Sequence, residues 1–467
     1  MNFHLANDDT VCFIGDSITH AGAYQTKDDP ASVRWAQPTP EHVAWADAEV
    51  GVIIHHDLQV YDPRYRVHEG PLPAAAAFNP SALDTDQWLA TAKAAGARYA
   101  VLVAKHGSGF CLWPTTVHDY SVRNTPWRNG RGDVVADFIA SCRRHNIRPG
   151  LYYSTTFNSY LKVKNPGRVV SGLAEDQRRY NDVVARQLTE LWTNYGPLFE
   201  IWFDGGVIPE AVGGPPLREL IERLQPQALC FQGPEGGKNL RWIGNERGEA
   251  PDPCWSTVDW GTAEDGVTDR TDLGGTPTGR YWYPGESDMP NRDQERAFLG
   301  GWFWKAGEDQ FLYPVEHLVE RYYQSVGRNT NLLLGMVIDD RGRVPDADVQ
   351  QFTEFGRRIR RLFEHCLGET AGTGNVLELS LGQPTRIDQV VLQEDIAGGE
   401  RVRRYVIEGL ADGRWTTLAA GQSIGHKRIA RFAPAAVGAV RFSAVEAVAT
   451  PRMRRLRVYS SLARGGR

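Results

Sequence analysis

The sequence predicts an α/β protein built on a (β/α)8-type barrel and followed by an all-β sandwich. Strand-like and helix-like segments alternate over most of the chain, which is typical of a parallel sheet covered by helices. Nearly eight such units fit between residues 38 and 366, and short strands separated by turns follow Cys366. We therefore expect an N-terminal extension (1–37), a barrel (38–366) and a sandwich (367–467).

The strand–helix units can be followed in order along the barrel region. The first pairs the apolar run GVIIHH (51–56) with a helix at 84–96, where Asp84 is typical of a helix start and Gly96 of a helix end. Further strands are predicted at 98–106, 148–154, 198–204, 228–233, 240–246 and 331–336, and further helices at 133–146, 179–196, 215–226, 316–327 and 346–366. The interval 250–300 has no clean periodicity, so we expect the barrel to be irregular there.

The C-terminal region has a different pattern. Short apolar segments alternate with Gly, Pro and Asp turns, and helical periodicity is weak. The segments are VLELSL, IDQVVLQ, RYVIEGL, RWTTLA and AVRFSA. This spacing predicts a β-sandwich of ordinary domain size.

Composition limits the classes of function. Hydrophobic residues make up 41% of the 467, charged residues 23%, and the net charge is −5, as in ordinary soluble proteins and unlike nucleic-acid-binding ones. No apolar run is long enough to span a membrane, and the N-terminus lacks the features of a signal peptide, so a cytoplasmic location is expected. The six cysteines are scattered, which predicts reduced structural thiols.

Polar side chains gather at the predicted C-terminal ends of the barrel strands, where barrel enzymes place their chemistry. These residues are His55 and His56, Lys105 and His106, Tyr152 and Tyr153, Asp204, and Asn245 with Glu246. Two carboxylates on different strands, among Trp and His, are the groups that a glycosidase needs. No metal or other cofactor is expected, because the consecutive residues of the HHD segment (55–57) point to opposite faces of a strand.

Several segments, in this order, resemble the α-L-fucosidases of glycoside hydrolase family 29, in the 1,3/1,4-fucosidase-like branch. They are FNPSALDTDQWLATAKAAGARYAVLVAKHGSGFCLWP, DYSVRNTPW, GDVVADFIASCRRHNIRPGLYYS, LTELWTNYGPLFEIWFDG, RWIGNERG and YYQSVGRNTNLLLG. The resemblance implies a retaining exo-glycosidase acting on terminal α-L-fucosyl linkages of a fucosylated oligosaccharide or glycoconjugate. More weakly, the sandwich resembles discoidin-like modules, which implies glycan binding, with simple packing against the barrel as the alternative.

The resemblance also assigns roles to residues. Asp204 of WFDG corresponds to the nucleophile and Glu246 of GNE to the acid/base, with Glu249 and Glu286 as fallback candidates. The substrate-binding residues that it implies are His55, His56, His106 and Tyr153 for the sugar hydroxyl groups and Trp113 and Trp302 as walls of the sugar site. A core role is the alternative for both tryptophans.

Two stretches depart from the family pattern. KHGSGF stands where the family has a sequence like KHHDGF, so Gly107 and Ser108 replace a histidine and an aspartate. IIHHD stands in place of a sequence like FIHFG. We expect a gap beside His106, filled by water, Ser108 or His56, and a sugar preference that extends to other L-sugars related to fucose. Loss of catalysis, leaving a carbohydrate-binding pseudoenzyme, is the alternative.

The N-terminal extension contains VCFIGDSITHAG (11–22), which resembles the nucleophile block of SGNH-type esterases and places Ser17 after a strand. Such an esterase needs a histidine, usually in D-x-x-H, and no aspartate of this chain has a histidine three positions later. We therefore interpret this segment as a remnant or a surface strand and expect no esterase activity.

Overall fold

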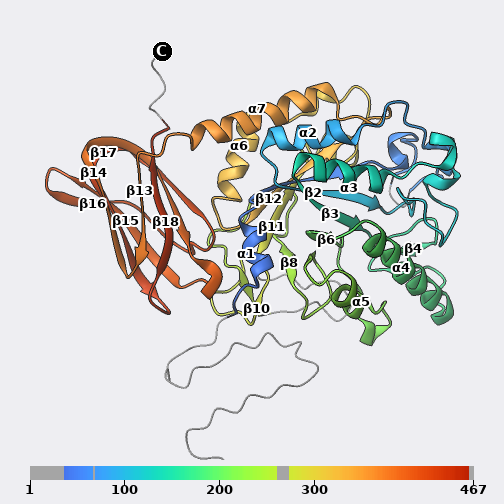
Figure 1. Cartoon of the computed structure of the whole chain (residues 1–467), viewed down its shortest axis with the longest axis horizontal. Helices are drawn as coiled ribbons and strands as arrows, with labels where there is room; N and C mark the ends of the chain where they lie inside the picture. Colours follow the sequence, from blue (N-terminus) through green and yellow to red (C-terminus); the bar gives the residue numbers. More distant parts are fainter. Residues whose placement is uncertain (1–35, 67–68, 260–272, 462–467) are drawn as a thin grey trace, which may run out of the picture. The chain divides into compact units, whose positions relative to one another are not determined.

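The computed structural model describes residues 36–66, 69–259 and 273–461. Ser17 and its segment lie outside the described residues. Eight parallel strands form a closed barrel, in an order that follows the chain (Figure 1). They are β1 (Val50–His55), β2 (Tyr99–Lys105), β3 (Arg148–Tyr153), β6 (Glu200–Trp202), β7 (Leu229–Phe231), β8 (Asn239–Trp242), β11 (Gly285–Met289) and β12 (Asn331–Val337).

Helices follow most of these strands. They are α2 (Thr85–Ala95) after β1, α3 (Val134–His145) after β2, α4 (Ala174–Asn194) after β3, α5 (Leu217–Leu224) after β6, α6 (Val315–Gln324) after β11 and α7 (Asp346–Leu362) after β12. In the described part of the chain, loops and short strands, and no α-helix, follow β7 and β8. The expected irregularity is confirmed, and it begins already at the β7–β8 connection.

Local signals explain where the helices begin and end. The Asp84 carboxylate accepts a hydrogen bond from the Gln87 backbone at the start of α2, and Gly96 ends the helix in a left-handed conformation. Asp133 caps α3 in the same way, through the Ala136 backbone. The remaining short elements are α1 (Pro40–Ala46), β4 (Val163–Lys164), β5 (Arg168–Val169), β9 (Thr257–Val258) and β10 (Tyr281–Trp282).

The strand that sequence analysis missed is β11. Its alternation places Glu286 and Asp288 on one face, and Met289 packs on the other face against the helices. All five residues are nonetheless buried. Because acidic residues take the inward positions that apolar residues fill elsewhere, the strand has no apolar pattern to detect.

The barrel interior is filled by inward-facing side chains from successive strands. Ile53, Tyr99, Tyr152 and Trp202 belong to this inner cluster, and Trp202 stacks on Phe231 with ring centroids 3.9 Å apart. A Cβ at Gly51 would lie 2.4 Å from the Tyr99 ring, so this tyrosine requires glycine on the neighbouring strand. The alternate residues pack outward against the helices in a second, larger cluster.

The C-terminal region is an antiparallel sheet of six strands that folds into two layers. The strands are β13 (Gly368–Thr373), β14 (Val376–Glu394), β15 (Val402–Ala411), β16 (Arg414–Gln422), β17 (Arg428–Ala447) and β18 (Arg452–Tyr459). The first part of β14 pairs with the last part of β17, beside β15, and the pairing shifts register after Ser380. The second part of β14 pairs with β18. Apolar side chains fill the space between the layers, as the predicted sandwich requires.

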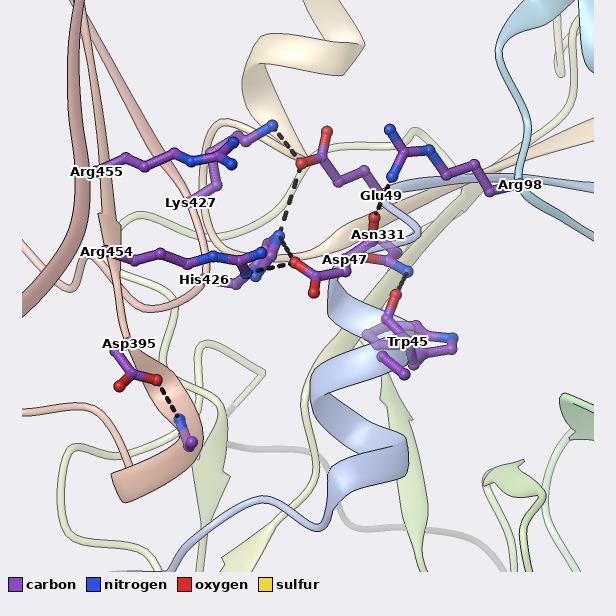
Figure 2. Close-up of polar contacts among 12 residues, drawn as sticks. Trp45, Asp47, Glu49, Arg98, Asn331, Asp395, His426, Lys427, Arg454 and Arg455 are labelled. Carbon is purple, nitrogen blue, oxygen red and sulfur yellow. Dashed lines mark hydrogen bonds and ion pairs between the residues drawn. The ribbon is translucent and has the colours of Figure 1, made fainter. Parts of the chain in front are cut away.

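Ion pairs connect the sandwich with the N-terminal side of β1 (Figure 2). Lys427 pairs with Glu49, and Arg454 Nη1 lies 2.6 Å from Asp47 Oδ1. His426 Nε2 lies 3.7 Å from the Asp47 carboxylate and 3.6 Å from the Glu49 carboxylate. The two folded regions therefore meet at the N-terminal end of the barrel strands.

Within the described ranges, no helix combines the length and apolar character needed to cross a membrane. No three His, Cys, Asp or Glu side chains of these ranges are placed to share a metal ion. The described cysteines carry free thiols, and Cys366 is the exposed one among them.

Candidate active site

A cavity of about 270 Å³ lies at the C-terminal ends of the barrel strands. Its lining includes His55 of β1 and His106 directly after β2. Asp204, Glu246 and Trp302 also line it, so five of the eight predicted site residues meet in one place. Parallel strands that end on the same rim bring together residues that are distant in sequence.

Asp204 follows β6 and is held by contacts to its side chain and its backbone. The Tyr152 hydroxyl donates to Asp204 Oδ2 at 2.9 Å, and Thr156 Oγ1 donates to the Asp204 carbonyl oxygen at 2.8 Å. Gly205 and Gly206 follow with φ values of 72° and 86°, a conformation that side chains disfavour. This turn leaves the carboxylate at the cavity without a bulky neighbour after it.

Tyr152 serves as the donor because its phenol keeps its proton. It is only 2% exposed, and burial, together with the charge of Asp204, raises the pKa of Tyr152 well above its usual value. The ring is fixed between Trp202, stacked at 5.3 Å, and His106, stacked at 5.8 Å. A buried neutral donor in a fixed position favours the ionised form of the carboxylate that it contacts.

Glu246 lies in the loop after β8, at the open side of the cavity. Its Oε2 accepts hydrogen bonds from Trp302 Nε1 at 3.0 Å and from Gln294 Nε2 at 3.2 Å. Burial of the carboxyl group raises the pKa of Glu246; the Trp302 hydrogen bond opposes this rise and the charge of Asp204 adds to it. The contacts of Asp204 thus favour its ionised form, as a nucleophile requires, and the surroundings of Glu246 favour its protonated form, as a proton donor requires.

A third carboxyl group lines the cavity, that of Asp288 on β11. It is 3% exposed and accepts a hydrogen bond from Trp242 Nε1 at 2.7 Å. Burial raises the pKa of Asp288 well above its usual value, and the charge of Glu246 adds to the rise. Asp288 is thus placed as a neutral acid beside Glu246.

Neutral imidazole and aromatic rings form the remaining wall. Burial lowers the pKa of His55 to about 3, so this ring is uncharged at neutral pH. The ring lies 5.2 Å from that of Trp302 and 5.1 Å from that of Phe303. Gly335 of β12 makes room for Trp302, because a Cβ there would lie 2.8 Å from the indole ring.

Beneath the cavity, two carboxyl groups lie inside the barrel. Glu286 accepts hydrogen bonds from Trp202 Nε1 at 2.9 Å and Tyr99 at 2.5 Å, and Glu200 accepts one from Trp45 at 3.0 Å. Burial and the adjacent Glu286 raise the pKa of Glu200 well above its usual value. These groups hold the floor of the site, since Trp202 lines the cavity directly.

Three predicted contact residues lie elsewhere, and these assignments are corrected. Tyr153 faces outward and donates to Gln187 of α4 at 2.7 Å, so Tyr152 takes the place in the cavity expected for Tyr153. His56 also faces outward, with its Nε2 2.9 Å from the Tyr61 hydroxyl. Trp113 is 2% exposed in the outer core, which was its alternative interpretation.

The fallback proton donors are also excluded by their positions. Glu249 pairs with Arg321 at 3.0 Å and does not line the cavity. Glu286 is fully buried below Trp202. Among the described residues, Glu246 and Asp288 are the carboxyl groups that line the cavity together with Asp204.

The two departures from the family pattern meet in the structure. Ser108 Oγ donates to Asp57 Oδ1 at 2.9 Å. The carboxylate next to position 108 therefore comes from Asp57, which follows the adjacent strand β1, and not from position 108 itself. Ser108 therefore has a partner away from His106, as His56 does. Gly107 lines the cavity itself.

Sequence reasoning missed Asp288 and Phe303 and chose the wrong tyrosine of the pair. The alternation of side chains along β3 distinguishes the two tyrosines. Tyr152 lies two residues after Gly150, so both face the interior of the barrel, whereas Tyr153 faces outward. Asp288 belongs to the strand that lacked an apolar pattern. Phe303 follows a loop whose course no local signal specifies.

A closed parallel barrel with several carboxyl groups and aromatic rings in one cavity at its C-terminal end is typical of a glycoside-hydrolase site. Comparison with known proteins agrees with this class. The family model described as alpha-L-fucosidase matches residues 19–361. The chain therefore belongs to the α-L-fucosidase family, glycoside hydrolase family 29.

Relatives in plants and bacteria support this assignment. A putative α-L-fucosidase 1 of Oryza sativa subsp. japonica is 32% identical over 85% of this chain and 79% of its own length. α-L-Fucosidase 1 of Arabidopsis thaliana is 31% identical over 76% and 74%. The crystal structure of a putative α-L-fucosidase from Bacteroides thetaiotaomicron has a TM-score of 0.86 and 35% identity and covers 91% of this chain and 100% of that one.

Proposed function

We propose that this protein is a retaining exo-glycosidase that hydrolyses terminal α-L-fucosyl linkages, or linkages of a closely related L-sugar, in oligosaccharides or glycoconjugates. The observation that carries the proposal is the placement of Asp204 and Glu246 in one cavity, with a fixed donor on the first and a raised pKa on the second. The family membership and the names of its relatives support the choice of sugar.

In the first step of the proposed reaction, Asp204 attacks the anomeric carbon while Glu246 donates its proton to the leaving oxygen. Tyr152 holds Asp204 in position, and Trp302 orients Glu246 through its indole N–H. In the second step, Glu246 removes a proton from water, which then releases the sugar from Asp204.

His55 and His106 line the cavity and supply hydrogen-bonding groups for the sugar. Because burial lowers the pKa of His55 to about 3, this residue presents an uncharged imidazole at the cavity. Trp302 lines the cavity and provides its apolar wall in this proposal.

Replacement of the two carboxylates tests the roles separately. Asp204→Gly should nearly abolish hydrolysis of an aryl α-L-fucoside, and azide should rescue it with a β-fucosyl azide of inverted configuration. Glu246→Ala should spare substrates with good leaving groups and form an azide of retained configuration.

Wild-type product of inverted configuration, or near-normal activity of Asp204→Gly, would refute the mechanism. Failure of the Glu246 result alone would move the proton donor to Asp288. Binding of fucose without turnover of any aryl L-glycoside would identify a pseudoenzyme.

A further inference from the structure

A second cavity, of about 1040 Å³, lies where the sandwich meets the barrel. We call it the junction cleft, lined by Asp47, Glu49, Arg98, the end of α7 and β18. Asp47 and Glu49 precede β1 and Arg98 precedes β2, so the cleft lies at the N-terminal ends of the strands, opposite to Asp204. The proposed hydrolysis makes no use of it.

Cations dominate the lining of the junction cleft. Three arginines come from the end of α7 and three from β18, and Arg98 and Lys427 complete a set of eight, against three carboxylates. The whole chain has a net charge of −5, so this concentration is a local reversal of the average. A cleft lined by one sign of charge raises the local concentration of oppositely charged ligands.

The three carboxylates all contact basic side chains in the described part of the chain, and Glu364 Oε2 lies 4.0 Å from His365 Nε2. Glu49 forms an ion pair with Lys427, and Asp47 forms one with Arg454 at 2.6 Å. Figure 2 shows Arg98 and Arg455 directed toward one another from opposite sides of Glu49. These acids therefore offset Lys427 and Arg454, whereas Arg357 pairs with Glu354 outside the cleft lining.

Three arginines of the cleft form no ion pair with a carboxylate among the described residues. Arg98 donates to the Asp47 carbonyl oxygen at 2.8 Å and Arg360 to the Ala94 carbonyl oxygen at 3.1 Å. Arg361 has no described hydrogen-bond partner, and all three residues are exposed. Arginine presents a planar set of donors that matches carboxylate, sulfate or phosphate oxygens.

Helix electrostatics explain only part of this cluster. Arg360 and Arg361 lie in the last turn of α7, where cations are favoured by the helix dipole. Strand β18 has no comparable dipole, yet Arg455 and Arg457 turn toward the cleft while Leu456 and Val458 pack inside the sandwich. Their shared carboxylate partner is Glu369, so they too carry an excess of positive charge.

The floor of the cleft is apolar and partly aromatic. Tyr459 and Phe363 lie with ring centroids 5.3 Å apart, and Val391 and Ile429 complete the surface. Rings of this kind pack against the C–H faces of sugars, whereas arginine heads at the rim contact charged substituents. The lining thus combines an apolar floor, many cations and a few carboxylates.

We propose that the junction cleft binds an anionic oligosaccharide, whose sulfate ester or carboxylate groups contact Arg98, Arg360 and Arg361 and whose sugar face packs on the partly exposed ring of Phe363. The three carboxylates of the lining repel dense negative charge, which favours a sparsely charged chain over a nucleic acid that carries one charge per ~1.7 Å. This inference goes beyond the proposed hydrolysis and concerns a separate site.

Titration calorimetry at low and moderate salt tests the proposal with four probes. They are lightly substituted dextran sulfate, polygalacturonate, uncharged dextran and a DNA duplex. The cleft variant is Arg98→Ser with Arg361→Ser, and the matched control is Arg178→Ser with Arg186→Ser on exposed positions of α4, which changes the net charge equally. Activity on a small aryl α-L-fucoside should be unchanged in both variants.

We expect the wild type and the control to bind dextran sulfate or polygalacturonate, and the cleft variant to bind ~10-fold or more weakly. Binding of only one probe would identify the charged group as sulfate or carboxylate. Equal affinity of the cleft variant and the control, absence of binding to both anionic glycans, or tighter binding of the duplex would overturn the proposal. A protein that binds the glycan but hydrolyses no fucoside would refute the proposed function and leave this inference standing.

Discussion

Removal of one oxygen atom tests how the barrel controls its nucleophile. In Tyr152→Phe, Asp204 loses the hydrogen bond of 2.9 Å that the buried phenol donates to Oδ2. The ring stays in place because it stacks on Trp202 and His106, so the change is confined to the hydroxyl group. The charged form of the carboxylate then loses a stabilising contact that the protonated form does not need.

The size of the effect follows from the type of hydrogen bond. A hydrogen bond to a charged group contributes about 1.5–3 kcal/mol, and 1.36 kcal/mol corresponds to a tenfold change. We therefore expect the acid limb of the pH profile of kcat/KM to move upward by about 1–2 pH units in Tyr152→Phe. The direction is upward because a proton then competes more effectively for the carboxylate that must attack.

The adjacent tyrosine provides a matched control. Tyr153→Phe removes an identical hydroxyl group, which donates to Gln187 in the outer core and not to Asp204. It should lower the free energy of unfolding by ~1 kcal/mol and leave the acid limb unchanged. If Tyr152→Phe leaves the limb in place, or if Tyr153→Phe moves it equally, the proposed control of Asp204 by Tyr152 is refuted.

The other predictions concern charge and packing. Because burial raises the pKa of Glu246, we expect the fall of kcat/KM at high pH to reflect loss of the Glu246 proton. Glu246→Gln should therefore lack this basic limb of the pH profile for substrates with good leaving groups. A retained basic limb would exclude Glu246 as the proton donor. Gly107→His should raise turnover of an aryl fucoside if the missing contact is limiting, whereas an unchanged or lower rate would show a pocket rebuilt for another sugar. Asp348→Asn should cost about 3–5 kcal/mol in denaturant unfolding, because it removes the buried charge that pairs with the Arg292 guanidinium and leaves only the longer contact to Asp309 at 3.6 Å; a loss below ~1 kcal/mol would contradict this. Burial opposes ionisation of Glu49, but Lys427 and His426 lower its pKa below the usual 4.5. The stability difference between the wild type and Glu49→Gln should therefore be largest near pH 7 and shrink as the pH falls below 4.5. A difference that does not change with pH would be inconsistent with the ion pair.

The sequence by itself determined the fold class, most of the strand–helix units and the two carboxylates proposed for catalysis. Apolar runs such as 198–204, and helix signals such as Asp84 and Gly96, act within a few residues, so a single sequence reveals them. Residues in motifs at the strand ends can be assigned to the site from sequence, because a parallel barrel brings the C-terminal ends of all its strands to one rim. Asp204 and Glu246 line the cavity for this reason.

Tertiary structure decided which side chains face that rim and which do not. Tyr152 enters the cavity and Tyr153 the outer core, because the closure of the barrel sets which face of β3 is inward. Strand β11 carries Glu286 and Asp288 inward, where Trp and Tyr donors from other strands compensate their burial, and no local pattern can announce such partners. The junction cleft likewise arises only when α7 and β18, nearly a hundred residues apart, meet beside Arg98. Charge that averages out along the chain is concentrated there because folding, and not sequence order, decides which arginines become neighbours.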